Sequence, residues 1–174
     1  MKYIIGIALM FILFSTKPAF ADMFSAVRCE TDIPKALIGQ HDSNERVAVT
    51  EQKHKDLDLK DLGASEVSEN LSVISWLICG HEFTLLEDDL SVVRDVLPFP
   101  SHSKDSPEFI GLCKADQMEM PNVLIAILNP KSGTNNLTAS VAWKIDEKNK
   151  RFVKISTIGL ACPRAGIITK DGGL

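Results

Sequence analysis

The histidines of this sequence are its best candidates for acid–base chemistry near neutral pH. His102 lies in Ser101-His102-Ser103-Lys104-Asp105, where a hydroxyl, an imidazole and a carboxylate follow one another closely. Members of a catalytic triad normally come from separate elements and meet at a fixed geometry, and the sequence has no Gly-x-Ser-x-Gly elbow. We therefore assign no catalytic residue. The simpler interpretation of this stretch is a set of solvated turn residues, and a binding role is the alternative, because exposed loops often carry function.

Four residues are the candidate binding residues: Phe99, His102, His81 and Glu82. Phe99 stands between two prolines, which restrict its conformation, so its ring is suited to fill a pocket of a partner. The alternative is that Phe99 folds back and covers the core. His81 and Glu82 lie at the tip of a predicted hairpin, where they form either an ordinary polar turn or a small polar site at the end of a sheet.

No metal site and no cofactor are predicted. The carboxylate-rich segment 56–61 lacks the glycine and the terminal glutamate of a calcium-binding loop. Structural zinc sites usually bring their ligands in close pairs, and here only Cys79 and His81 lie near each other among the cysteine and histidine candidates. Zinc is therefore the weaker use of the cysteines.

The even number of cysteines predicts two disulfides, as is usual in an exported chain. The four are Cys29, Cys79, Cys113 and Cys162. Four cysteines allow three pairings, and the sequence leaves the pairing open. We favour Cys29–Cys79 with Cys113–Cys162, because each bond then joins neighbouring parts of the chain.

Residues 1–21 are predicted to be a signal peptide. Lys2 supplies the positive start, Tyr3–Phe14 the apolar region, and Ala19-Phe20-Ala21 the small residues that a signal peptidase recognises. The apolar run is too short to span a bilayer comfortably, so we expect cleavage after Ala21 and no stable membrane insertion of the mature chain, with an uncleaved anchor as the alternative.

Residues 22–174 suit a single domain with one core. Two of the 19 basic residues, Lys2 and Lys17, belong to the signal peptide. The formal net charge is therefore −4 for the full chain and −6 for the mature chain. This acidic charge, and the absence of a basic cluster in the sequence, argue against nucleic acid as a partner.

The stretch Leu71–Glu87 is predicted to lie at the centre of the fold. Leu71 and Val73 lie on one alternating face and Trp76 and Ile78 on the other, so a strand here buries both of its faces. The polar interruption after residue 78 predicts a hairpin. A helix through the same residues stays an alternative, because short apolar runs are ambiguous.

Further strands are predicted from apolar alternation and from apolar runs. Residues 137–145 and 152–158 predict an antiparallel hairpin, and residues 123–128 a buried strand. Weaker signals predict short strands at Val47-Ala48-Val49, 110–113 and 167–169. Residues 51–70 and 88–97 stay open between helix and strand, and residues 98–107 are a proline-rich loop.

The predicted fold class is mainly β, with α+β as the alternative. We expect a single antiparallel β-sheet or a sandwich-like domain, with a little helix and two disulfides.

The predicted role is that of a periplasmic or secreted module that binds another protein, for example an inhibitor or an immunity-type protein acting on an envelope or secreted protein. A proline-stiffened loop suits this role, because it loses little entropy on docking. A small periplasmic hydrolase is the first alternative, and an envelope structural or assembly protein the second. A non-enzyme is favoured, and the oligomeric state stays open.

Overall fold

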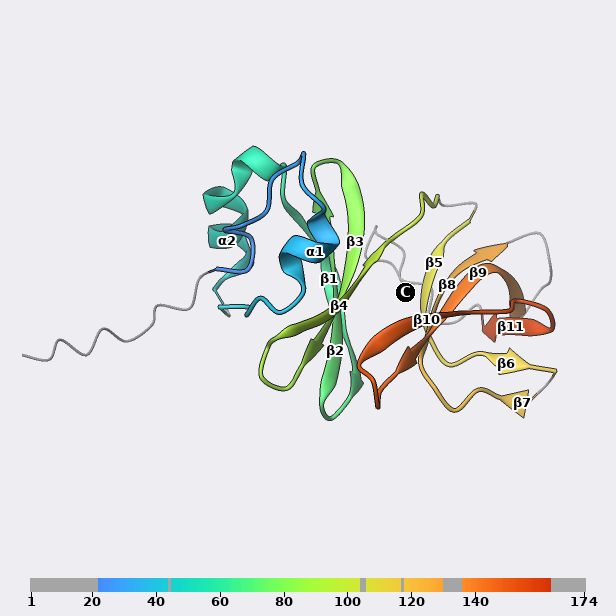
Figure 1. Cartoon of the computed structure of the whole chain (residues 1–174). Helices are drawn as coiled ribbons and strands as arrows, with labels where there is room; N and C mark the ends of the chain where they lie inside the picture. The colour runs from blue at the N-terminus through green and yellow to red at the C-terminus, as the bar shows by residue number, and fades with distance from the viewer. Residues whose placement is uncertain (1–21, 44, 104–105, 117, 130–135, 164–174) are drawn as a thin grey trace, which may run out of the picture.

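The computed structural model describes residues 22–43, 45–103, 106–116, 118–129 and 136–163. The predicted signal peptide (1–21) and the predicted strand at 167–169 lie outside these described residues. Two antiparallel sheets stand side by side, and short helices lie against the outer face of the first sheet (Figure 1). The fold is therefore mainly β with a little helix, as the sequence predicts.

The first sheet contains four antiparallel strands in chain order: β1 (Lys60–Ser68), β2 (Leu71–Ile78), β3 (His81–Asp88) and β4 (Val93–Pro98). The predicted central hairpin is confirmed, because β2 and β3 pair along their whole length around a turn at Cys79 and Gly80. Both turn residues have positive φ, 53° and 77°, as the tight turns that match the twist of a hairpin require. The formation of β4 settles the open segment 88–97 in favour of strand.

Strand β2 buries both of its faces, as predicted. Trp76 and Ile78 pack into an apolar cluster beneath the helices, whereas Leu71 and Val73 belong to a second cluster that faces the other sheet. This two-sided burial explains the nearly continuous apolar sequence of β2.

A helical layer covers the outer face of the first sheet. It contains α1 (Ile33–Leu37), α2 (Val47–Lys53) and the 3-10 turn η1 (Lys55–Leu57). The strand predicted at Val47-Ala48-Val49 is wrong, because these residues begin α2 and all three are exposed. The segment 51–70 contains the end of α2, then η1 and β1, so both of its open alternatives occur in turn.

The second sheet has the order β5-β8-β9-β11-β6-β7, and β10 pairs with the remaining part of β9. Its strands are β5 (Glu108–Gly111), β6 (Lys114–Ala115), β7 (Met118–Glu119), β8 (Leu124–Asn129), β9 (Asn136–Asp146), β10 (Arg151–Ile155) and β11 (Leu160–Pro163). The hairpin predicted at 137–145 and 152–158 is confirmed as β9 and β10, although β10 already ends at Ile155. The predicted buried strand 123–128 is β8, and the short strand predicted at 110–113 begins earlier, as β5.

The inner faces of the two sheets share one apolar cluster. The first sheet and the residue after β4 contribute Leu71, Val73, Leu86 and Phe99, and the second sheet contributes Ile125, Ile127, Trp143 and Ile145. This shared core is what makes the fold sandwich-like, and it fixes the ends of the strands relative to one another.

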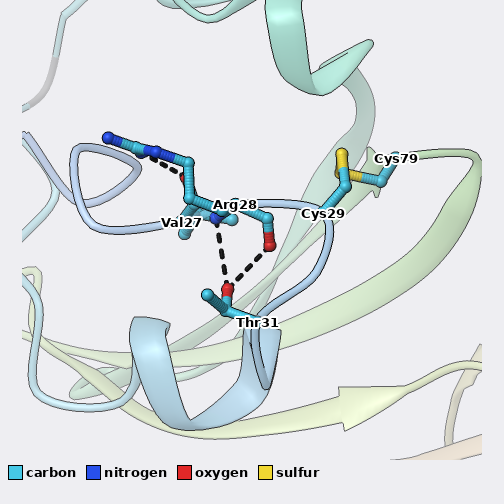
Figure 2. The surroundings of a disulfide bond; sticks show 5 residues. All are labelled: Val27, Arg28, Cys29, Thr31 and Cys79. Carbon is cyan, nitrogen blue, oxygen red and sulfur yellow. Dashed lines mark hydrogen bonds between the residues drawn. A yellow bond between two sulfur atoms is a disulfide. The ribbon is translucent and has the colours of Figure 1, made fainter.

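Two disulfides hold the fold, in the pairing that we favoured: Cys29–Cys79 and Cys113–Cys162. They close loops of 50 and 49 residues, each worth about 4 kcal/mol in the chain-entropy model. The first bond joins the N-terminal segment to the turn between β2 and β3, beside a turn closed by the Thr31 hydroxyl, which donates to Arg28 O at 2.7 Å (Figure 2).

Candidate functional site

One cluster of polar side chains lies where the two sheets and their connection meet. It contains Glu82 from the start of β3, His102 from the β4–β5 connection (residues 99–107) and Glu108, the first residue of β5. One imidazole nitrogen and two carboxylate oxygens of these residues lie within 4.8 Å of one another. We call these three residues the Glu-His-Glu cluster.

Strand alternation brings the two glutamates to the same place. Glu82 shares a face of β3 with Leu86, which packs between the sheets. Glu108 shares a face of β5 with Ile110, which packs against the same inter-sheet cluster. Because the two faces oppose each other, their terminal carboxylates converge at one end of the shared core.

The connection is fixed at both of its ends. Phe99 N–H donates to Glu82 O at 2.8 Å, and Leu128 N–H donates to Pro107 O at 2.9 Å. Between them, Ser103 N–H donates to Ser106 O at 3.1 Å and Ser106 N–H donates back to Ser103 O at 2.9 Å. These hydrogen bonds hold the described part of the connection in one conformation.

Phe99 is part of the core. Its side chain is only 7% exposed, and its ring lies 6.0 Å from that of Trp143. The structure therefore shows the alternative in which Phe99 covers the core, which corrects its assignment as an anchor for a partner. The same ring meets His102 edge-on at 5.5 Å and so helps to orient the imidazole.

His102 and Glu82 are brought together, although 20 residues separate them. His102 Nε2 lies 2.9 Å from Glu82 Oε2, and the two side chains are 13% and 11% exposed. A histidine oriented by a carboxylate is half of the arrangement used in general-base catalysis, and it is also a pair of metal ligands. Partial burial lowers the local dielectric constant, and this strengthens the electrostatic interactions that the pair can make in either role.

His81 is not part of this site, although it was a candidate binding residue. It is exposed at the start of β3, and alternation directs it away from the face that carries Glu82. Glu108 belongs to the site, and sequence reasoning missed it. The available signal was a glutamate directly after the proline that ends the loop, at the start of a strand.

Two other charged groups have structural roles. Asp88 accepts hydrogen bonds from Arg94 Nε at 2.6 Å and Lys150 Nζ at 3.1 Å, and Lys150 belongs to the β9–β10 turn of the other sheet. Burial alone would raise the pKa of Asp88, but these hydrogen bonds outweigh it and lower the pKa to about 2. Asp95 reinforces the junction, because its Oδ2 accepts from Phe152 N–H at 2.7 Å.

Asp22, the residue after the predicted cleavage site, is also held firmly. It lies 2.8 Å from both Lys53 Nζ and His54 Nε2, and it accepts from Phe24 N–H at 3.0 Å. Burial opposes ionisation here as well, but the hydrogen bonds from Lys53 and His54 prevail and lower the pKa of Asp22 to about 2.

Glu87 is the opposite case. It is 3% exposed, and its Oε1 has no hydrogen-bond partner among the described residues. Burial raises the pKa of Glu87 to about 7, and the charges of Asp42 and Asp88 add to the effect. This carboxyl faces the helical layer, on the side of β3 that also carries Phe83 and Leu85, away from the Glu-His-Glu cluster.

All four cysteines are in disulfides, so the alternative of zinc bound by cysteine is overturned. No helix among the described residues is both long and apolar enough to cross a membrane. Comparison with protein-family models, with curated proteins and with solved structures gives no match for this chain.

Proposed function

We propose that this protein is an exported binding module that contacts another protein through the β4–β5 connection. The predicted signal peptide and the two disulfides support export, since disulfides persist in oxidising compartments such as the periplasm and the extracellular space. The observation that carries the binding role is the combination of exposed polar side chains and hydrogen-bonded backbone in the described part of this connection, residues 99–103 and 106–107.

Among the described residues of the connection, the exposed polar residues are Ser101 and Ser103, which flank the partly buried His102. Phe99 fixes one end of this segment in the core, and the paired backbone hydrogen bonds of Ser103 and Ser106 fix the other. Backbone that is already held by hydrogen bonds, as in these described residues, loses little conformational entropy on docking, so that more of the contact energy appears as affinity. Serine and histidine are adaptable hydrogen-bonding groups of the kind found in protein contact loops.

The test is capture of a partner from an envelope extract by the immobilised mature protein, identified by mass spectrometry. Ser101→Lys places a bulky charge on the proposed surface, and we expect it to reduce capture about tenfold, equivalent to about 1.4 kcal/mol. The matched control is Ser25→Lys, at an exposed serine of the N-terminal segment. Both variants should melt like the parent protein. Equal capture by both variants, or equal loss in both, would contradict the proposal.

A small hydrolase is the second candidate, and the His102–Glu82 pair favours it. Glu82 at 2.9 Å can orient the imidazole, as the carboxylate beside a catalytic histidine does. A panel of ester, peptide and glycoside substrates tests this candidate. Turnover that disappears in His102→Ala but persists in His81→Ala would support the hydrolase over the binding module.

A further inference from the structure

We infer that the Glu-His-Glu cluster binds a divalent transition-metal cation. Glu82, His102 and Glu108 come from β3, the connection and β5, so a bound cation would join both sheets and the segment between them. This site goes beyond the proposed function and does not depend on it, because the ligands are defined by their own geometry.

The spacing of the ligand atoms suits a small cation. In a tetrahedral site with bonds of about 2.0–2.2 Å, neighbouring ligand atoms stand about 3.4 Å apart. His102 Nε2 and Glu82 Oε2 are 2.9 Å apart, and one possible ligand atom from each of the three residues lies within 4.8 Å of the other two. Movements on the order of 1 Å, which side-chain rotation provides, therefore convert the cluster into a coordination shell.

The chemical types of the ligands select the class of metal. An imidazole nitrogen favours zinc, copper, iron or nickel over calcium and magnesium, which take oxygen ligands. The two carboxylates match the double charge of the cation. Three protein ligands with partly exposed side chains leave a fourth position for water or for a group of a partner.

The surroundings of the cluster hold the ligands in place. Phe99 packs its ring against His102 at 5.5 Å, and its backbone N–H holds Glu82 O at 2.8 Å. Pro107, the residue before Glu108, is fixed by Leu128 N–H. Apolar and hydrogen-bonded neighbours of this kind orient the side chains that coordinate the cation in metal sites, and so strengthen metal binding.

The test is isothermal titration calorimetry, in which ZnCl₂ is titrated into the chelator-treated mature protein. A titration with MgCl₂ is the comparison. We expect one zinc per chain and much weaker binding of magnesium. His102→Gln and Glu108→Gln should each weaken zinc binding by about 100-fold or more, beyond the 10- to 100-fold cost of losing an outer contact. The matched controls, His81→Gln and Glu119→Gln, change an exposed histidine and an exposed glutamate, and should bind zinc like the parent.

A second readout is the visible spectrum of bound Co²⁺, which should be present in the controls and lost in His102→Gln. Circular dichroism and melting establish that each variant is folded. The inference is overturned if the parent binds no zinc, or if both ligand variants bind it as the parent does. Zinc binding without capture of a partner contradicts only the proposed function, and capture without zinc binding contradicts only this inference.

Discussion

Glu87→Gln should change the way in which the stability of this protein depends on pH. Glu87 is buried and has a pKa of about 7, whereas an exposed glutamate titrates at 4.5. Between these two values the unfolded chain has released the proton while the folded chain still holds it. Stability therefore falls as the pH rises from about 4.5 to 7 and stays low above that range.

The size of this effect follows from the shift. A difference of one pKa unit corresponds to about 1.4 kcal/mol, so the step from 4.5 to about 7 corresponds to about 3 kcal/mol of unfolding free energy between pH 4 and pH 8. Glutamine has nearly the same shape but does not ionise. Glu87→Gln should therefore remove this loss, and its stability relative to the parent should rise by about 3 kcal/mol between pH 4 and pH 8.

The assay is urea unfolding of the mature parent and variant at pH 4, 5, 6, 7 and 8, with the difference in free energy taken at each pH. Taking the difference cancels the titration of the other groups. Glu69→Gln, at an exposed glutamate in the β1–β2 turn, is the control and should show a flat difference. A flat difference for Glu87→Gln as well would refute the reasoning about its burial.

Three further predictions concern the core, the N-terminal segment and the cysteines. Trp76→Ala should lower the unfolding free energy by about 3–5 kcal/mol in urea, because Trp76 is 5% exposed and packs edge-on against Phe24; a loss below about 1 kcal/mol would contradict its burial. Asp22→Asn should lower the unfolding free energy by about 2 kcal/mol at pH 7, since the lowered pKa of Asp22 stabilises the fold above pH 3.8, and this loss should vanish as the pH falls to about 2. An equal loss at pH 7 and pH 2 would argue against the ionic role of Asp22. Mass spectrometry should find a mature chain that starts at Asp22, with no thiol labelled before reduction and four labelled after it. Labelling of two or more cysteines without reduction would contradict the two disulfides.

The parts of the fold that follow from local pattern could be predicted. The apolar residues of β2 define two buried faces. The turn at Cys79 and Gly80, where both residues have positive φ, connects β2 to β3. The favoured cysteine pairing was also correct: Cys29–Cys79 joins the N-terminal segment to the turn between β2 and β3, and Cys113–Cys162 joins the residue before β6 to β11, the strand that pairs with β6.

The errors arose where long-range packing decides the structure. Val47-Ala48-Val49 has the composition of a strand, but none of the described strands pairs with it and its side chains are exposed, and the local chain forms α2. The burial of Phe99 depends on Trp143 from the other sheet, which no local pattern around the prolines reveals.

The candidate site could be predicted only in part, for the same reason. His102 and Glu82 were selected individually for their polarity near loops and turns. Their contact at 2.9 Å, and the convergence of Glu108 with them, follow from the way in which the two sheets pack through a shared core. The local sequence pattern does not show how the two sheets pack against each other.

Hydrogen exchange of the mature protein, alone and bound to its captured partner, tests most directly whether the β4–β5 connection is the contact surface. We predict slower exchange in peptides that cover residues 99–107, with little change in β1 or in the helical layer. Slower exchange confined to the helical layer, with unchanged exchange in residues 99–107, would contradict this assignment and place the contact surface on the opposite side of the first sheet.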